Sequence, residues 1–319
     1  MKKIAVLTSG GDSPGMNAAI RAITRAGLAQ DFEVFGIRDG FAGLMAQDFI
    51  QLDRFSVSDI MVRGGTMLGS ARLSNFSDTN IQKEAIKILK KFQIDALVVI
   101  GGDGSYRAAA DLMNLNFPVV ALPGTIDNDI ASTEYTIGFD TALNTIIEAI
   151  DKLRDTSSSH HRCSVVEVMG NESGDLALYA AISCGAEIVI TKETGFDEDK
   201  VIERLVYLDQ IRQKRHAIVV ISEKITDVED LAQKISEFTT FSGRSTVLGH
   251  VQRGGSPSAF DRVLATKMGD KAVEALTNGD IKHCVGIKDG KVEIIAMEEA
   301  LNLAVPSRAS LYKLQKRLI

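Results

Sequence analysis

Short and almost unbroken apolar runs constrain the fold of this chain more than any other feature. Residues 96–100 read Ala-Leu-Val-Val-Ile, and residues 3–8, 118–122 and 217–222 are similar. A strand with one face in water alternates apolar and polar side chains, whereas a parallel strand covered on both faces is apolar throughout. These runs therefore predict parallel strands inside a sheet that has helices on both faces.

Runs of this kind alternate with segments of helical periodicity along the whole chain. We expect helices near Gly15, over Ala142–Leu153 and in the tail Ser307–Ile319. The expected strands are Lys3–Thr8, Glu33–Ile37, Ile94–Ile100, Pro118–Leu122, Ser164–Met169, Ile188–Thr191, Ala217–Ser222 and Thr246–Leu248. This alternation is typical of an α/β fold with a doubly wound parallel sheet.

Composition excludes several classes of protein. The 319 residues are enough for about two domains. Lys and Arg number 36 against 42 Asp and Glu, and this net charge of −6 argues against bulk binding to nucleic acid or anionic membranes. The three cysteines lie far apart, and no CxxC pair, HExxH motif or EF-hand loop occurs. We therefore expect neither a disulfide framework nor a zinc site.

The N-terminus does not resemble a secretory leader. Its apolar run, residues 4–8, gives way to serine, glycine and aspartate, and no run of about 18 apolar residues follows anywhere in the chain. The sequence therefore predicts a cytoplasmic protein.

Loops rich in glycine and aspartate follow three of the expected strands. They are Ser9–Gly15, Gly101–Ser105 and Pro123–Asp129. Ligands of open α/β sheets bind at the carboxyl ends of strands, where glycine allows close approach of the backbone and a helix N-terminus favours an anion. Any one of these loops alone could be a tight turn. Together they predict a site for phosphate groups.

Carboxylates in these loops indicate what the site does. Asp103 lies among glycines and is a natural ligand for Mg²⁺ beside phosphate oxygens. Asp127 and Asp129 would point the same way in an extended segment, one toward a metal ion and one toward a substrate hydroxyl. No GxxxxGK[ST], GxGxxG, HRD or DFG motif occurs, which argues against P-loop enzymes, nicotinamide cofactors and protein kinases.

These motifs resemble a known family. Ser9–Asn17, Gly101–Ser105, Pro123–Asp129, Met169-Gly170 and Leu248–Pro257 are similar to the corresponding segments of bacterial ATP-dependent 6-phosphofructokinases, and the similarity covers essentially the whole chain. The resemblance implies two doubly wound parallel-sheet domains, each with three αβα layers. Residues 1–138 with 252–304 would bind ATP and Mg²⁺, and residues 139–251 with 305–319 would bind the sugar phosphate.

The resemblance also implies a reaction and its residues. The γ-phosphate of ATP would pass to the 1-hydroxyl of fructose 6-phosphate, giving fructose 1,6-bisphosphate and ADP, the committed step of glycolysis. Asp127 would be the general base, Asp103 and Asp129 would hold Mg²⁺, and Gly11, Arg72 and Thr125 would steady the transferring group. ATP would contact Gly11, Arg72, Leu73, Gly102, Asp103, Gly104 and Ser105.

The family pattern assigns a second group of residues to the sugar phosphate. Arg162 and Arg244 would reach it from a neighbouring subunit of a homotetramer. The whole set is Thr125, Ile126, Asp127, Arg162, Met169, Gly170, Asn171, Glu223, Arg244, His250, Val251, Gln252 and Arg253. Arginine suits this task because its fork matches phosphate oxygens.

An effector site is implied as well. ADP would activate and phosphoenolpyruvate would inhibit the enzyme there, with Glu187 meeting the Mg²⁺ that accompanies ADP. Its residues would be Arg21, Arg25, Arg54, Arg154, Gly185, Ala186, Glu187, Arg212, Lys214, Arg215 and His216.

Some positions bear on the phosphoryl donor and on rate. Gly104 and Gly124 stand where pyrophosphate users of the family tend to carry Asp and Lys, which favours ATP. Asn171, Ala108 and Lys224 stand where the family usually has Arg, Gly and Gly. Because Mg²⁺, Arg72 and Thr125 remain, we expect Asn171 to cause only a modest deficit in rate.

Two other interpretations stay open. A pyrophosphate-dependent or other sugar-phosphate kinase would use the same scaffold. A degenerate homologue that only senses a sugar phosphate or nucleotide would account for Asn171, Ala108 and Lys224. A sensor has no use for a general base, however, and Asp127 is present.

Overall fold

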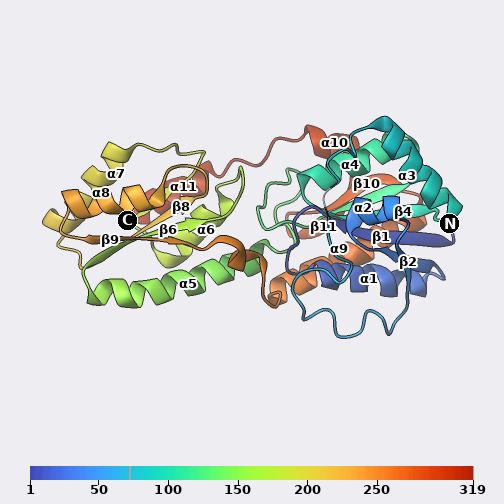
Figure 1. The fold of residues 1–319 in the computed structure, drawn as a ribbon, viewed down its shortest axis with the longest axis horizontal. Coiled ribbons are helices and arrows are strands. Elements are labelled where there is room, and N and C mark those ends of the chain that lie inside the picture. Colours follow the sequence, from blue (N-terminus) through green and yellow to red (C-terminus); the bar gives the residue numbers. More distant parts are fainter. Residues whose placement is uncertain (72, 319) are drawn as a thin grey trace. The chain divides into compact units, whose positions relative to one another are not determined.

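The computed structural model describes residues 1–71 and 73–318 and divides into two compact units (Figure 1). Unit 1 comprises Met1–Thr141 and Arg253–Pro306, and unit 2 comprises Ala142–Gln252 and Ser307–Ile319. Arg72 and Ile319 lie outside the described residues. Each unit is built on a sheet of its own.

Unit 1 contains a seven-stranded sheet of order β11-β10-β5-β4-β1-β2-β3. The neighbours from β10 to β2 pair in parallel, while β3 and β11 add antiparallel edges. The bounds are β1 Lys3–Ser9, β2 Glu33–Ile37, β3 Phe49–Leu52, β4 Ala96–Gly101, β5 Val119–Pro123, β10 Lys282–Lys288 and β11 Lys291–Ala296.

Helices cover both faces of this sheet because its central strands are apolar on both. Val6 and Val98 pack in one core cluster with side chains of α1 and α9, whereas Leu7 and Val99 pack in another with α2, α3 and α4. Residues next to each other on a strand thus enter opposite cores. The helices are α1 Met16–Ala29, α2 Gly40–Ala46, α3 Thr79–Lys91, α4 Asp103–Asn114, α9 Ala259–Asn278 and α10 Met297–Asn302.

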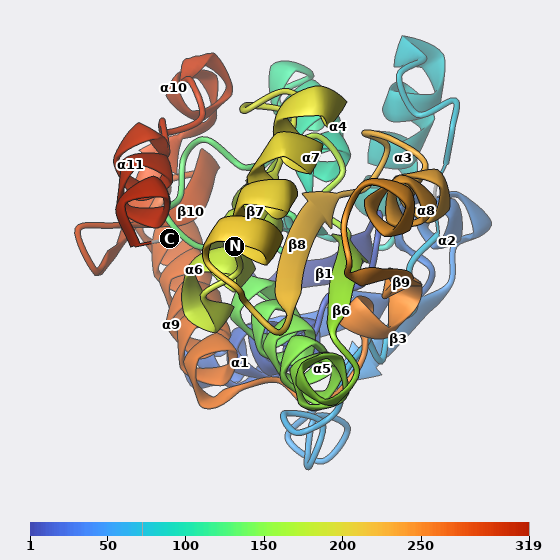
Figure 2. The same ribbon diagram turned by 90° about the vertical axis from the view of Figure 1, so that its left-hand side faces the viewer.

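Unit 2 has a four-stranded, all-parallel sheet of order β7-β8-β6-β9. Its helices α7 and α8 pack against Val165 and Val219 on one face, and Ser157 of α5 bonds Ser164 on the other (Figure 2). The strands are β6 Arg162–Val168, β7 Ile188–Ile190, β8 Ala217–Ser222 and β9 Ser242–Val247. The helices are α5 Phe139–Ser159, α6 Asp175–Cys184, α7 Glu198–Val206, α8 Val228–Phe238 and α11 Ala309–Leu318, with short helical turns at Tyr207–Ile211 and Gly249–Arg253.

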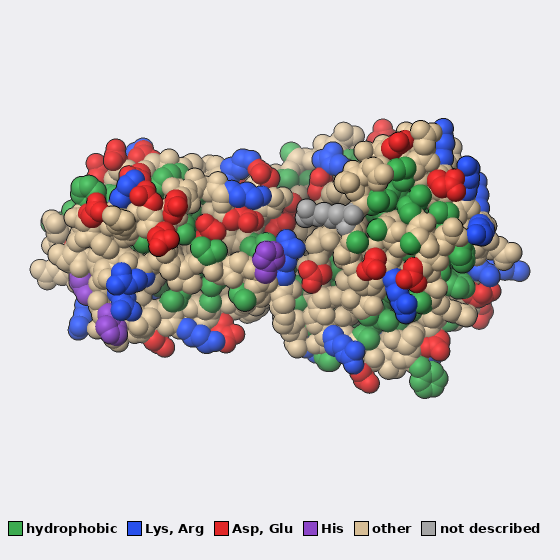
Figure 3. Space-filling model, in the orientation of Figure 1, with side chains coloured by type: hydrophobic (Ala, Val, Ile, Leu, Met, Phe, Trp, Pro, Cys, Tyr) green, Lys and Arg blue, Asp and Glu red, His purple; other side chains and the backbone are tan. Residues whose placement is uncertain are grey.

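Acidic and basic side chains are interspersed on the face drawn in Figure 3. In the part of the chain that the structure describes, no helix is both long and apolar enough to cross a membrane.

The predicted α/β class is confirmed, although some of the predicted helices and strands differ from those in the structure. The expected strands are present with ends that differ by a few residues, and Thr246–Leu248 proves to be the end of a strand that begins at Ser242. Three strands, β3, β10 and β11, were not predicted. All three lie in antiparallel pairs toward the sheet edges, where polar residues interrupt the apolar pattern. Helix α5 also exceeds its predicted bounds at both ends.

A buried carboxylate fixes the start of α5. Asp261 of α9 is fully buried and accepts hydrogen bonds from the backbone N–H of Gly138 at 3.0 Å and of Thr141 at 2.8 Å. The Thr141 hydroxyl donates to it as well, at 2.5 Å. Asp261 thereby satisfies N–H groups that a helix N-terminus leaves without intrahelical partners. Burial outweighs these bonds and raises the pKa of Asp261 to about 6.

This raised pKa predicts a pH-dependent difference between the protein and its Asp261→Asn variant. A carboxyl whose folded pKa is raised stabilises the fold below its unfolded pKa and loses that contribution as pH rises through about 6. Relative to the variant, the protein should therefore lose about 2 kcal/mol of stability between pH 4 and pH 7. Urea unfolding at a series of pH values measures this difference.

Asp197→Asn is the matched control. Asp197 caps α7 on the surface, and hydrogen bonds from the Lys200 side chain and backbone lower its pKa, so its contribution runs the other way with pH. If the free energies of unfolding of the protein and of Asp261→Asn changed with pH in parallel, the raised pKa of Asp261 would be contradicted.

Candidate functional site

Three loops of unit 1 begin side by side because their strands are neighbours and parallel. Ser9 at the end of β1 pairs with Gly101 of β4, and Gly101 pairs with Pro123 of β5. The loops that follow these residues are the glycine- and aspartate-rich segments. The sheet register thus brings together the starts of the loops that carry Gly11, Asp103 and Asp127.

Close packing of backbone joins the loops. A Cβ atom at Gly101 would overlap the Ser105 hydroxyl and the Ser9 carbonyl oxygen, so this position accepts glycine alone. A Cβ at Gly102 would lie 3.5 Å from Cβ of Thr125, which is ordinary contact. The loop after β4 therefore lies directly against the loop after β5.

A cation lies over the first loop. The guanidinium of Arg253 covers Gly11 so closely that a Cβ there would be 3.0 Å from Nη1. The Nε atom of Arg253 is buried and has no hydrogen-bond partner among residues 1–71 and 73–318. A buried donor without a partner suits a phosphate oxygen. Gly11 and Arg253, predicted to bind different substrates, are thus adjacent.

The loop after β5 turns at its centre. Thr125 Oγ1 accepts from the Asp127 backbone N–H at 3.2 Å and lies 3.4 Å from Asp127 Oδ2. Asn128 has a left-handed backbone, with φ of 53°. The segment from Asp127 to Asp129 is therefore not extended, and the expectation of an extended segment, on which the shared direction of the two carboxylates rested, was wrong.

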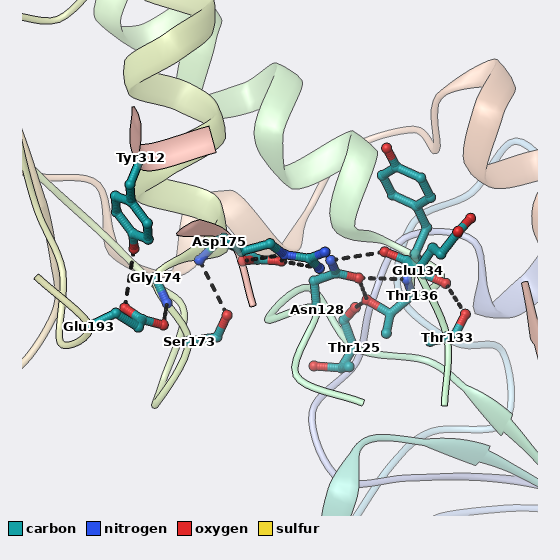
Figure 4. Close-up of polar contacts among 12 residues, drawn as sticks. Thr125, Asn128, Thr133, Glu134, Thr136, Ser173, Gly174, Asp175, Glu193 and Tyr312 are labelled. Carbon is teal, nitrogen blue, oxygen red and sulfur yellow. Dashed lines mark hydrogen bonds and ion pairs between the residues drawn. The ribbon is translucent and has the colours of Figure 1, made fainter. Parts of the chain in front are cut away.

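Asn128 holds this turn in place, a role that sequence reasoning missed. Its side chain accepts from the Thr136 backbone N–H at 2.9 Å and donates to the Glu134 carbonyl at 3.2 Å (Figure 4). The Thr136 hydroxyl in turn donates to the Thr125 carbonyl at 2.6 Å. The available signal was the residue type, because Asn adopts the left-handed conformation more readily than most residues.

Asp103 opens α4, the helix that follows β4. Its carboxylate is half-exposed and accepts from Arg107 Nε at 2.8 Å, one turn further along the helix. Gly104 has nothing within 4 Å of where a Cβ would be, so the start of this helix is open. Ser105 is buried, and Leu73 is partly exposed. Arg72 lies outside the described residues.

The carboxylates of these loops fit Mg²⁺ better than a metal caged by protein alone. No group of three His, Cys, Asp or Glu side chains able to hold a metal occurs among the described residues. Mg²⁺ is usually held by one or two carboxylates together with substrate phosphates and water. Asp103 and Asp129 supply that number.

In unit 2, the expected sugar-phosphate residues gather at the carboxyl ends of β6 and β8. The backbone N–H of Asn171 donates to Glu223 Oε1 at 2.8 Å, and that of Met169 donates to Gln252 Oε1 at 3.1 Å. Gln252 also donates to the Gly249 carbonyl at 2.9 Å and is fully buried, so it positions the loops. His250 and Val251 beside it are exposed.

Two arginines of the same set lie further back along the strands, Arg162 at the amino end of β6 and Arg244 three residues into β9. Arg162 is the first residue of β6, and Arg244 pairs beside Ser164 on β9. With about 3.3 Å per residue, Arg162 lies about 20 Å along the strand from its carboxyl end. Within one chain Arg162 therefore does not meet Met169 and Glu223.

Part of the expected effector site also assembles at this amino-end edge. Glu187 is buried, forms an ion pair with Lys214 and accepts from the Ile218 backbone N–H at 2.7 Å. Arg154 donates to the Cys184 carbonyl and lies 3.5 Å from His216 Nε2. Burial lowers the pKa of His216 against the opposing charge of Glu187, and the charges of Arg154 and Lys214 lower it further.

The remaining effector residues are distributed over both units. Gly185 has a left-handed backbone, with φ of 63°, and Ala186 is buried. Arg212 and Arg215 are exposed in the turn before His216. Arg21 and Arg25 belong to α1 of unit 1, and Arg54 follows β3 there.

The C-terminal helix supports the loop after Asn171, a second feature that the sequence did not reveal. Glu193 accepts from the Gly174 backbone N–H at 2.9 Å and from the Tyr312 hydroxyl at 3.3 Å (Figure 4). Tyr312 of α11 also bonds Thr191 at 2.6 Å. No local motif signals a contact between residues so far apart in the chain.

Comparison with known proteins places this geometry in a family. A family model described as phosphofructokinase matches residues 3–276. The chain belongs to the phosphofructokinase family. The ATP-dependent 6-phosphofructokinase of Aliivibrio salmonicida (strain LFI1238) is 52% identical over 100% of this chain and 99% of its own length. That of Vibrio cholerae serotype O1 is 53% identical over the same shares.

Solved structures agree on the fold. Phosphofructokinase from Saccharomyces cerevisiae superposes with a TM-score of 0.86 at 33% identity, covering 99% of this chain and 46% of its own. A pyrophosphate-dependent phosphofructokinase from Marinobacter aquaeolei has a TM-score of 0.86 over 100% of this chain and 92% of its own. At 19% identity this second likeness shows the fold alone.

The buried position of Gln252 predicts that Gln252→Leu weakens both stability and sugar-phosphate binding. The variant leaves the Met169 N–H and the Gly249 carbonyl unpaired, which should lower the free energy of unfolding by about 2 kcal/mol. Fructose 6-phosphate affinity, measured by calorimetry, should fall about tenfold. Gln233→Leu, on the exposed face of α8, should change neither quantity. Lost binding with unchanged stability would instead make Gln252 a direct ligand.

Proposed function

We propose that the protein transfers the γ-phosphoryl group of ATP to the 1-hydroxyl of fructose 6-phosphate. It is an ATP-dependent 6-phosphofructokinase, as are the relatives that match it over their full length. One structural observation supports this assignment. The turn holding Thr125 and Asp127 lies against the nucleotide loop at Gly102, on the same sheet edge as Gly11 with Arg253 above it.

Each loop has a distinct task in this proposal. Asp127 accepts the proton of the sugar 1-hydroxyl, and the freed oxygen attacks the γ-phosphorus. Thr125 orients Asp127 through the bond between its hydroxyl and the Asp127 backbone. The Gly11 backbone and Arg253 steady phosphate oxygens, which contributes electrostatically where charge is redistributed.

Asp103 and Asp129 are the residues that would hold Mg²⁺. When bound, the ion neutralises phosphate charge. Asp103 would exchange its Arg107 partner for the metal, and the half-exposed position of this ion pair makes the exchange inexpensive in free energy. Leu73, Gly104 and Ser105 complete the nucleotide side, together with Arg72.

The donor is ATP in this proposal. The open space at Gly104 leaves room for a nucleotide beside the start of α4. At Gly124, in contrast, a Cβ would lie 2.9 Å from Ile100 and 3.1 Å from Met16, so larger residues at this position do not fit here. The relatives at 52% and 53% identity are ATP-dependent.

A second copy of the chain completes the sugar-phosphate site. Arg162 begins β6, about 20 Å along the strand from Met169 and Glu223, so one chain does not offer all of these residues to one ligand. Arginines from a neighbouring subunit resolve this separation. The homotetramer expected from the family supplies such neighbours.

The effector cluster is proposed to bind ADP and phosphoenolpyruvate. Arg154, Lys214 and His216 offer positive or protonatable groups to a phosphate, and Glu187 would release Lys214 to meet the ion on ADP. The arginines of α1 and Arg54 would join from the other side of a subunit contact. The cytoplasmic location stays a prediction.

The proposal is tested by parallel assays with two donors. Fructose 6-phosphate and Mg²⁺ are supplied with ATP or with pyrophosphate, and fructose 1,6-bisphosphate is measured. We expect product with ATP only, and a fall of about 10²–10⁴-fold in Asp127→Ser because general-base catalysis contributes about that much. Product with pyrophosphate would establish the other donor, and binding of sugar phosphate without product would establish a sensor.

Mixed subunits test the two-copy site. Asp127→Ser and Arg162→Ser should each be nearly inactive alone. Co-refolded hybrids should regain activity, because a site can then take Asp127 from one chain and Arg162 from the other. Absence of recovery, with hybrid formation verified by native mass spectrometry, would show that each site uses one chain.

A further inference from the structure

Two residues of unit 2 combine an unusual backbone with a mutual contact. Asn171 follows β6 and Lys224 follows β8, strands that pair through Val168 and Ser222. Both residues have a left-handed backbone, with φ of 55° at Asn171 and 65° at Lys224. Lys224 Nζ donates to Asn171 Oδ1 at 2.9 Å.

The backbone of Lys224 is not explained by packing. A left-handed conformation favours glycine, and a lysine there carries a conformational cost. Its side chain is exposed and therefore recovers no burial energy. Strained residues that persist without a structural reason cluster at functional sites.

The contact leaves the ammonium available to an anion. The Asn171 oxygen is a neutral acceptor, so it orients Lys224 without cancelling its charge, and two N–H donors remain for a ligand. Among the described residues, the ion pairs do not include Lys224, although Lys192 nearby is paired with Glu172. Asn171 is itself fixed because its backbone N–H donates to Glu223.

Acidic residues lie along the chain on both sides of this lysine, at Glu223 and Asp227. Burial and the charges of Glu223 and Asp227 raise the pKa of Glu167, a residue near the carboxyl end of β6. A phosphate would be repelled from such surroundings unless a cation met it. Lys224 is the cation that the geometry supplies.

We propose that Lys224 binds a substrate phosphoryl group and that Asn171 is the positioning residue that holds it. This inference deepens the proposed function and rests on it. It assigns a role to both departures from the family pattern at once. Lys224, which follows β8, supplies the positive charge that Asn171, which follows the neighbouring strand β6, lacks.

Kinetics of Lys224→Met test the proposal, since methionine keeps the length and removes the charge. We expect kcat/KM for fructose 6-phosphate to fall about tenfold or more. A rise in KM alone assigns Lys224 to the 6-phosphate, and a fall in kcat assigns it to the transferring phosphoryl group. Lys224→Arg should retain most of the activity. Unchanged kinetics in Lys224→Met would overturn the proposal.

A matched control accompanies this variant, and further variants test whether Asn171 acts through Lys224. Lys200→Met removes another exposed lysine of unit 2, one that is paired with Asp197, and should leave the kinetics unchanged. Asn171→Ala should reproduce the Lys224→Met loss, and the double variant should be no worse than either single one. Additive losses would show that Asn171 does not act through Lys224.

Stability distinguishes a functional lysine from a structural one. Lys224→Gly relieves the backbone, so it should raise the urea midpoint while lowering kcat/KM. A lysine kept only to neutralise carboxylates would instead lower the midpoint when removed. Moving the cation back, in Asn171→Arg with Lys224→Gly, should restore the activity that Lys224→Gly loses.

The proposal can fail separately from the kinase assignment. If the unmodified protein makes no fructose 1,6-bisphosphate with either donor, the proposed function fails. Calorimetry with fructose 6-phosphate and fructose then still tests Lys224. A tenfold loss of affinity in Lys224→Met for the phosphorylated sugar only supports a phosphate contact, and equal affinities overturn it.

Discussion

Parallel pairing of β1, β4 and β5 is the constraint on which the rest of unit 1 depends. Parallel strands that are neighbours end at the same edge, so the loops after Ser9, Gly101 and Pro123 begin together whatever their sequences. The apolar strands keep this register because a slip of one residue would exchange the side chains of the two cores. The chemistry of the loops is thus positioned by residues that take no part in it.

Much of this arrangement could be read from the sequence. Unbroken apolar runs predict buried parallel strands. The glycine-rich segments that follow these strands predict the edge of the sheet at which a ligand binds. The antiparallel strands β3, β10 and β11 escaped because their polar residues resemble loops. The turn at Asn128 also escaped, since its conformation depends on bonds to Thr136 and Glu134 that arise only in the folded chain.

Contacts between distant residues set a limit on what local patterns reveal. Gln252 reads as a ligand residue within its motif, yet its amide is occupied by Met169 and Gly249. Asn171 and Lys224 read as separate departures, and only the pairing of β6 with β8 makes them one feature. Side-chain burial and strand pairing therefore changed the roles that we assign to these residues.

Strand β8 has a consequence for communication within unit 2. It begins beside Glu187 and His216, and it ends beside Glu223 and Lys224. Six residues of buried strand span about 20 Å and bend little, because neighbours are hydrogen-bonded on both sides. The strand therefore places Glu187 and His216 at one end of a rigid element that is hydrogen-bonded on both sides, and Glu223 and Lys224 at its other end.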